Sequence, residues 1–136
     1  MKARYETKKG KMKLTLSVLE DVFTIHRFPP DQDVPKQVFE EKFVSICKTD
    51  DELSIVCSSS ILLDSESHED GWACIKVLGP LDFSLTGILA DISTVLAKAK
   101  ISIFAISSFD TDYILVKSET LQAAKTALQK AAFVFQ

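Results

Sequence analysis

The fold is decided by one stretch of the second half of the chain, which reads Leu85-Thr86-Gly87-Ile88-Leu89-Ala90-Asp91-Ile92-Ser93-Thr94-Val95-Leu96-Ala97-Lys98-Ala99. Its apolar residues recur at the spacing of a single helical face, whereas Asp91, Thr94 and Lys98 face away. Residues 72–78 before it alternate as a strand does, and residues 100–109 after it are β-branched and aromatic. We therefore expect an amphipathic helix that connects two strands.

The pattern of alternating strands and helices continues to the end of the chain. Residues 113–117 predict another strand, Ser118 is placed to cap a helix, and residues 133–135 predict a short final strand. The apolar face of that last helix carries Leu121, Ala124, Leu128 and Ala131. The order β-α-β-β-α-β predicts an α+β fold of the ferredoxin-like kind, in which two helices back an antiparallel sheet.

The first half contains shorter elements that predict a related module. Apolar alternation marks four strands, at residues 14–18, 22–28, 43–48 and 53–58. Pro35 is expected to open a short helix over residues 36–39. The segments 46–58 and 106–118 align without gaps, each as a strand, an acidic turn, an apolar strand and a serine. We interpret this as an internal repeat of two ferredoxin-like modules in tandem, the first with a shortened first helix.

This interpretation divides the chain into four segments. Residues 1–12 are basic and are expected to be a disordered, solvated tail. The first module covers residues 13–63 and the second covers residues 72–136. Between them, residues 64–71 contain no apolar side chain and end in glycine, so we expect an exposed linker there.

Composition excludes several classes of protein. The net charge of −3 gives the chain no overall positive potential that would attract nucleic acid. The apolar runs are too short to cross a bilayer, and no secretory signal pattern is expected at the start, so no membrane partner is predicted. Cys47, Cys57 and Cys74 are widely spaced in strand patterns, which favours reduced, buried thiols in the cytosol over a disulfide framework.

Two segments of the second half have the chemistry of a binding site. The loop over residues 79–87 is rich in small residues and opens a helix, whose first N–H groups can meet a carboxylate. The turn over residues 107–112 carries Asp110 and Asp112, which can meet an ammonium group. Together they predict a receptor for an amino acid or a related small zwitterion.

Three motifs of the chain resemble the ACT-domain superfamily. Residues 80–89 and 103–116 look like its second-module motifs, and residues 49–57 are similar to the first-module signature of small tandem ACT proteins. Relatives of that group include cytosolic arginine sensors of the CASTOR type. The resemblance covers residues 14 to about 134, and it implies a tandem ferredoxin-like fold, frequent dimerisation, and amino-acid binding at interfaces between modules or subunits.

The resemblance also implies which residues contact the ligand. They lie in the loop before the first helix of the second module and in the hairpin turn: Asp82, Phe83, Ser84, Leu85, Thr86, Gly87, Ser108, Phe109 and Asp112. Asp112 corresponds to an acidic position that receives a basic ligand group in the arginine sensors. Those relatives also carry acidic residues where this chain has Ser84 and Leu85. This departure favours a smaller or more apolar amino acid, or no ligand, over arginine.

Alternatives remain open on the sequence alone. Ser84 or Thr86 can be an ordinary helix cap, and aspartates are common in hairpin turns because they bond their own backbone. An enzyme is disfavoured, because neither His26 nor His68 lies in a nucleophile motif and no glycine-rich phosphate loop exists. We expect no cofactor and no metal. The sequence predicts a non-catalytic regulatory module that signals to a protein partner, and the alternative is a ligand-independent dimerisation or protein-interaction scaffold.

Overall fold

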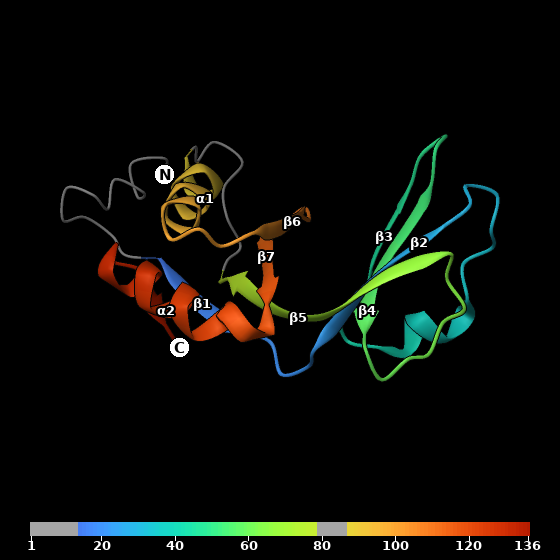
Figure 1. Cartoon of the computed structure of the whole chain (residues 1–136), viewed down its shortest axis with the longest axis horizontal. Helices are drawn as coiled ribbons and strands as arrows, with labels where there is room; N and C mark the ends of the chain where they lie inside the picture. The colour runs from blue at the N-terminus through green and yellow to red at the C-terminus, as the bar shows by residue number, and fades with distance from the viewer. Residues whose placement is uncertain (1–13, 79–86) are drawn as a thin grey trace. The chain divides into compact units, whose positions relative to one another are not determined.

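The computed structural model describes residues 14–78 and 87–136, which fall into two units (Figure 1). Unit 1 comprises the described part of Met1–Leu19 together with that of Ala73–Gln136. Unit 2 comprises Glu20–Trp72. Strand β5 (Ser67–Val77) runs through the boundary, so its first residues belong to unit 2 and its last residues to unit 1.

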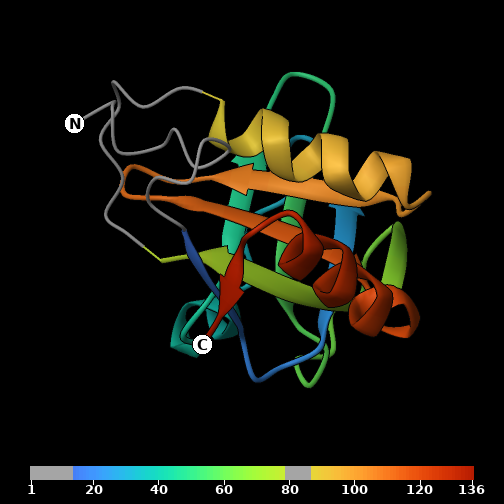
Figure 2. The same cartoon turned by 90° about the vertical axis from the view of Figure 1, so that its left-hand side faces the viewer.

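Unit 1 has the predicted order of elements. After β5 follow α1 (Ile88–Lys98), β6 (Ile103–Ser107), β7 (Asp112–Lys117), the short 3₁₀ turn η4 (Ser118–Thr120), α2 (Leu121–Lys130) and β8 (Val134–Phe135). Strands β6 and β7 form an antiparallel hairpin, and β7 also pairs with β5. Both helices lie on the same face of these strands (Figure 2). The prediction of an α+β, ferredoxin-like fold is confirmed.

One strand of unit 1 comes from the start of the described chain. Strand β1 (Thr15–Val18) pairs antiparallel with the end of β5 and parallel with β8. This strand falls within the module predicted at residues 13–63, but its ladder partners all lie in unit 1. Alternation identified the strand correctly, yet it carries no information about which sheet the strand joins.

The core of unit 1 consists of side chains at the predicted helical and strand spacings. Ile92 and Leu96 of α1 and Leu128 of α2 are fully buried, and they pack against alternate residues of β5 and β7. Leu89 and Val95, also predicted on the apolar stripe, pack partly buried at its edge. The apolar face of each helix is therefore what holds it to the sheet, as is usual for helices of this length.

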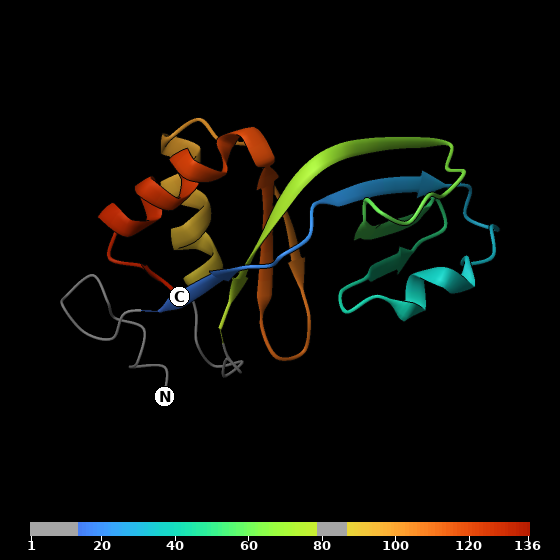
Figure 3. The ribbon, with the colours of Figure 1, turned by 90° about the horizontal axis from the view of Figure 1, so that it is seen from below.

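Unit 2 is an antiparallel sheet with one short helix. Its strands are β2 (Phe23–Phe28), β3 (Ser45–Lys48), β4 (Leu53–Ser58) and the start of β5, in the order β3-β4-β2-β5. The 3₁₀ helix η3 (Lys36–Glu40) follows Pro35, as predicted, and lies beside the strands of this unit (Figure 3). Its Val38 is fully buried in one cluster with Leu53 and Ile55 of β4. No helix follows β4 in unit 2, where the described segment 59–66 connects to β5.

The predicted linker is partly a strand, which corrects the expectation of a loop over residues 64–71. Strand β5 begins at Ser67 and pairs with β2, with His68 opposite His26 and Trp72 opposite Phe23. Residues 67–70 are exposed, so they lack the apolar alternation that marks a strand in sequence. Backbone pairing with β2 forms this part of the strand, and composition cannot reveal such pairing.

The cysteines differ in burial. All three are free thiols; Cys57 and Cys74 are buried as predicted, whereas Cys47 of β3 is exposed, so the prediction was wrong there. Burial raises the pKa of Cys74 to about 12. Burial, together with the negative charge of Glu41, also raises the pKa of Cys57. The thiolate is the reactive form of cysteine. These two thiols are therefore unreactive for two reasons: reagents cannot reach them, and their raised pKa values keep them protonated.

We expect a thiol-specific reagent at pH 8 to modify only Cys47 in the folded protein and all three cysteines in denaturant. Spectrophotometric titration with an aromatic disulfide reagent measures the number of reactive thiols directly. The matched variant Cys47→Ser should abolish the fast reaction in the folded state. Rapid modification of folded Cys47→Ser would contradict the buried positions of Cys57 and Cys74.

Candidate functional site

The structure describes four of the nine predicted ligand residues. Asp82, Phe83, Ser84, Leu85 and Thr86 lie outside the described residues. Gly87 is the N-cap of α1, with a φ of +87°, and its carbonyl accepts a hydrogen bond from the N–H of Asp91 at 2.8 Å. No described atom lies within 4 Å of where a Cβ would be, so the glycine is needed for its left-handed backbone and not for close approach.

The turn of the β6–β7 hairpin is organised by its own polar side chains. Ser107 donates from Oγ to Oδ1 of Asp112 at 2.6 Å. The Oγ and the N–H of Ser108 both donate to the carbonyl of Thr111, at 3.0 and 2.8 Å. Phe109 is 79% exposed at the tip of the turn. Asp112 therefore has a structural role within the hairpin, and its side chain remains half-buried at the surface.

A buried hydroxyl fastens this turn to the end of β5. Thr111 is 5% exposed, and its Oγ1 donates to the carbonyl of Val77, the last residue of β5. The sequence pattern does not distinguish Thr111, because a threonine between two aspartates is an ordinary turn residue. Only its burial identifies it as the residue that holds the acidic turn beside the strand end.

The described parts of the predicted site lie at one end of unit 1. The end of β5, the start of α1 and the β6–β7 turn are on the same side of that unit in two perpendicular views (Figures 2 and 3). The N-terminal turn of a helix offers N–H groups without intrahelical partners, and a carboxylate such as that of Asp112 accepts hydrogen bonds from an ammonium group. The start of α1 and the carboxylate of Asp112 thus offer groups of opposite polarity.

Membrane spans and metal clusters are both absent from the described part of the chain. Within residues 14–78 and 87–136, no helix has the length and apolar character needed to span a bilayer. In the same ranges, no three His, Cys, Asp or Glu side chains are grouped so that they could hold a metal ion.

The fold defines unit 1 as a ferredoxin-like α+β module, and comparison with known proteins identifies its family. Residues 67–130 match the ACT domain, and residues 21–62 match a family model described as an N-terminal domain. An Agrobacterium tumefaciens protein of known crystal structure is 35% identical, covers 91% of this chain and 92% of its own, and superposes with a TM-score of 0.84. The chain therefore belongs to the ACT-domain family.

Other solved structures share the fold at lower identity. A Vibrio cholerae protein, titled as of unknown function and a possible transport protein, is 18% identical, covers 88% of this chain and 91% of its own, and has a TM-score of 0.68. The ligand-free regulatory subunit of aspartate kinase from Thermus thermophilus is 15% identical, covers 84% of this chain and 96% of its own, and has a TM-score of 0.58. The narrower resemblance to small tandem proteins of the arginine-sensor type stays a prediction.

Proposed function

We propose that the protein binds an amino acid or a related zwitterion at the end of unit 1 where α1 begins and where the β6–β7 turn lies. The observation that carries this proposal is the hydrogen bond from buried Thr111 to Val77, which fixes the acidic turn beside the strand that leads toward α1. In this proposal Asp112 accepts the ammonium group, and residues 82–87 meet the carboxylate with backbone N–H groups and hydroxyls.

The expected ligand is small and carries both charges. An anion beside an exposed helix N-terminus gains about 0.3–1 kcal/mol from the helix dipole, so the carboxylate alone would bind weakly. A charge-assisted hydrogen bond between an ammonium group and Asp112 contributes roughly twice as much as a neutral one. Affinity therefore requires both groups in one molecule, which an amino acid provides.

The role that we propose for binding is regulatory and not catalytic. If the ligand lies where a second copy of the chain docks, it binds the associated chains more tightly than the free chain. Binding then shifts the equilibrium toward association by that difference in affinity. A protein partner would sense this change. The Thermus structure is titled as a regulatory subunit, which supports such a role by likeness of fold. The three free thiols agree with a reducing compartment such as the cytosol.

Thermal unfolding of the full chain in the presence of each of the proteinogenic amino acids tests this proposal. A ligand that binds only the folded state adds about 2.7 kcal/mol of stability at a concentration of roughly 100 times its Kd, which raises Tm visibly. We expect a rise for a small group of related amino acids, confirmed by calorimetry. No rise with any of them at millimolar concentration would refute binding, and a dimer whose association no amino acid alters would support a scaffold instead.

A further inference from the structure

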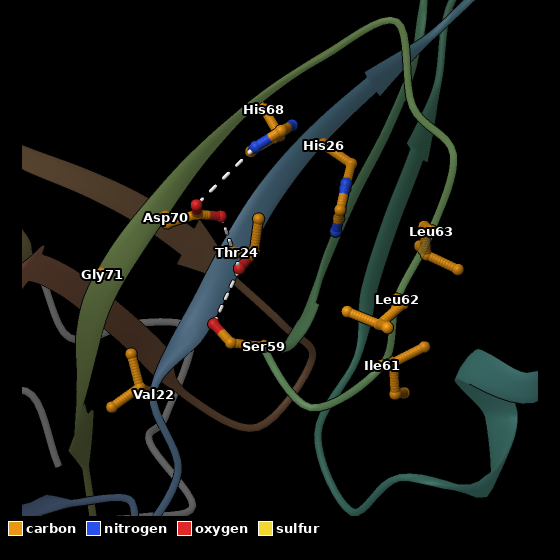
Figure 4. A pocket seen from close by; sticks show the side chains of 10 residues that line it. All are labelled: Val22, Thr24, His26, Ser59, Ile61, Leu62, Leu63, His68, Asp70 and Gly71. Carbon is orange, nitrogen blue, oxygen red and sulfur yellow. Dashed lines mark hydrogen bonds and ion pairs between the residues drawn. The ribbon is translucent and has the colours of Figure 1, made fainter.

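One face of the sheet of unit 2 packs the hydrophobic core of that unit, and the same face also carries a group of polar side chains. Thr24, His26 and Phe28 alternate along β2 and pair with Cys57, Ile55 and Leu53 of β4, so they share one face of the sheet. Phe28 belongs to the apolar cluster that Val38 of η3 covers. Thr24 and His26 are as deeply buried, at 4% and 5% exposed, but they lie beside a pocket of about 460 Å³ (Figure 4).

A bulge in β5 shapes one wall of this pocket. Trp72 pairs with Phe23 and Glu69 pairs with Ile25, so Asp70 and Gly71 together oppose the single residue between them on β2. Gly71 has a φ of +78°, a left-handed backbone that favours glycine. Asp70 therefore lies on the pocket face beside Thr24. Beyond the bulge the alternation is shifted by one residue, so that Trp72 lies on the opposite face with Phe23. Bulges commonly re-aim a side chain next to a functional site.

The hydroxyls on the pocket floor are bonded in a way that leaves acceptors facing the pocket. Thr24 Oγ1 donates to Asp70 Oδ1 at 3.2 Å and lies 2.7 Å from Ser59 Oγ. Because a hydroxyl has one proton, Ser59 must be the donor in the second bond, and its lone pairs remain available as acceptors. The other oxygen of Asp70, Oδ2, lies 3.6 Å from His68 Nε2. With the carboxylate of Asp70, the floor is therefore suited to a group that donates several hydrogen bonds, such as an ammonium group.

His26 supplies a further hydrogen-bonding atom. Its Nδ1 lies 2.8 Å from Ser65 Oγ, and its Nε2 has no hydrogen-bond partner among the described residues. The ring points into the space between β2 and the segment that carries Ile61, Leu62 and Leu63 (Figure 4). Burial, and secondarily the charge of His68, lowers the pKa of His26, opposed by Asp70, so the ring is neutral near pH 7. Unpartnered buried polar atoms are uncommon in folded proteins and call for an explanation.

Apolar side chains form the outer part of the same pocket. Val22 is 46% exposed and Leu62 is 86% exposed, although both are large hydrophobic residues, and Ile61 and Leu63 lie beside them. A pocket of this volume, with an apolar rim and a few convergent polar groups, has the usual composition of a small-molecule site.

We propose that this pocket is a second ligand site that takes a small amphipathic amine. The ammonium group binds Asp70 and Ser59, and the hydrocarbon part covers Val22 and Leu62. His26 Nε2 is closed to solvent, so a hydroxyl on the ligand bonds it only after a neighbouring side chain shifts; a hydroxyl then complements either tautomer of the neutral imidazole. The site lies wholly within unit 2 and differs from the site proposed in unit 1 in needing no carboxylate on the ligand.

Leucinol is a suitable probe, because it has an ammonium group, a hydroxyl and a branched hydrocarbon but no carboxylate. We expect calorimetry on the full chain to show saturable binding of leucinol, and much weaker binding of 4-methylpentan-1-ol, which lacks the amine. Equal binding of the two compounds, or no saturable binding of leucinol at millimolar concentration, would overturn the proposal.

Variants assign the binding to this pocket. Asp70→Asn is expected to weaken leucinol binding by about tenfold or more, since it removes the charge from the acceptor. Glu69→Gln is the matched control, because Glu69 pairs with Ile25 on the other face of the sheet. Asp112→Asn, in unit 1, should leave leucinol binding unchanged, which separates this site from the proposed amino-acid site. An equal loss in Glu69→Gln, or a loss in Asp112→Asn, would contradict the assignment.

Discussion

We expect Leu128→Ala to lower the free energy of unfolding by about 2–5 kcal/mol, the usual cost of a leucine truncation that leaves a cavity in a close-packed core. Leu128 is fully buried in unit 1, among residues of both helices and of the sheet beneath them. The carbonyl of Leu128 accepts a hydrogen bond from the N–H of Phe133 at 3.0 Å, which holds the end of α2 in place. The helix end therefore cannot move freely to fill the cavity that the substitution leaves. The loss is a large share of the roughly 5–15 kcal/mol that stabilises a typical domain.

Urea unfolding followed by circular dichroism measures this change. Gln129→Ala is the matched control, because Gln129 is the next residue of α2 and is exposed. We expect that substitution to alter the free energy of unfolding by less than about 0.5 kcal/mol. A Leu128→Ala protein as stable as the Gln129→Ala protein would show that α2 does not pack on the sheet as described.

The parts of unit 1 that could be predicted from sequence are those in which burial imposes a period. Ile88, Ile92 and Leu96 are buried at intervals of four residues along α1, and the same spacing is visible in the order of the amino acids alone. In the same way, Ile114 and Val116 of β7 alternate toward the unit 1 core. Period and order together were sufficient to predict the ferredoxin-like plan.

What could not be predicted depends on pairing between distant segments. Strand β1 joins β5 and β8 by backbone hydrogen bonds that any alternating strand could make. The exposed start of β5 is a strand only because β2 lies beside it. Cys47 pairs with Ser54 of β4, whose neighbour Ile55 belongs to the buried cluster of unit 2, so Cys47 lies on the opposite face of the sheet and its side chain is exposed. Each of these features is set by tertiary context and leaves no local signal.

The two candidate sites differ in how well they could be predicted from the sequence. The acidic turn was singled out from residues close together in the chain, although its attachment through Thr111 was not. The pocket of unit 2 joins residues that lie far apart: Thr24 bonds Ser59 across 35 positions and Asp70 across 46. In the sequence, His26 is an isolated histidine on a predicted strand. A strand ladder and a bulge bring it to the pocket, and neither is apparent in the residue pattern.

The second large effect concerns Asp112. We expect Asp112→Asn to weaken binding of the amino acid found by thermal unfolding by roughly 10- to 100-fold, which corresponds to about 1.5–3 kcal/mol for a hydrogen bond to a charged group. The asparagine can still accept the hydrogen bond from Ser107 Oγ that Asp112 accepts at 2.6 Å, so the hairpin should keep its geometry. The change thus removes the charge without removing the turn, and calorimetry measures its effect on affinity.

Asp110→Asn separates a specific contact from a general charge effect. Asp110 lies in the same turn and is exposed, so both variants change the net charge equally within two residues of each other. If Asp112 bonds the ligand directly, its variant loses affinity by the full factor, while Asp110→Asn changes affinity only slightly and less at high salt, because exposed charges are screened. Equal losses in the two variants would mean that the acidic turn attracts the ligand only by its overall negative charge. No loss in either variant would show that the turn is not part of the binding site.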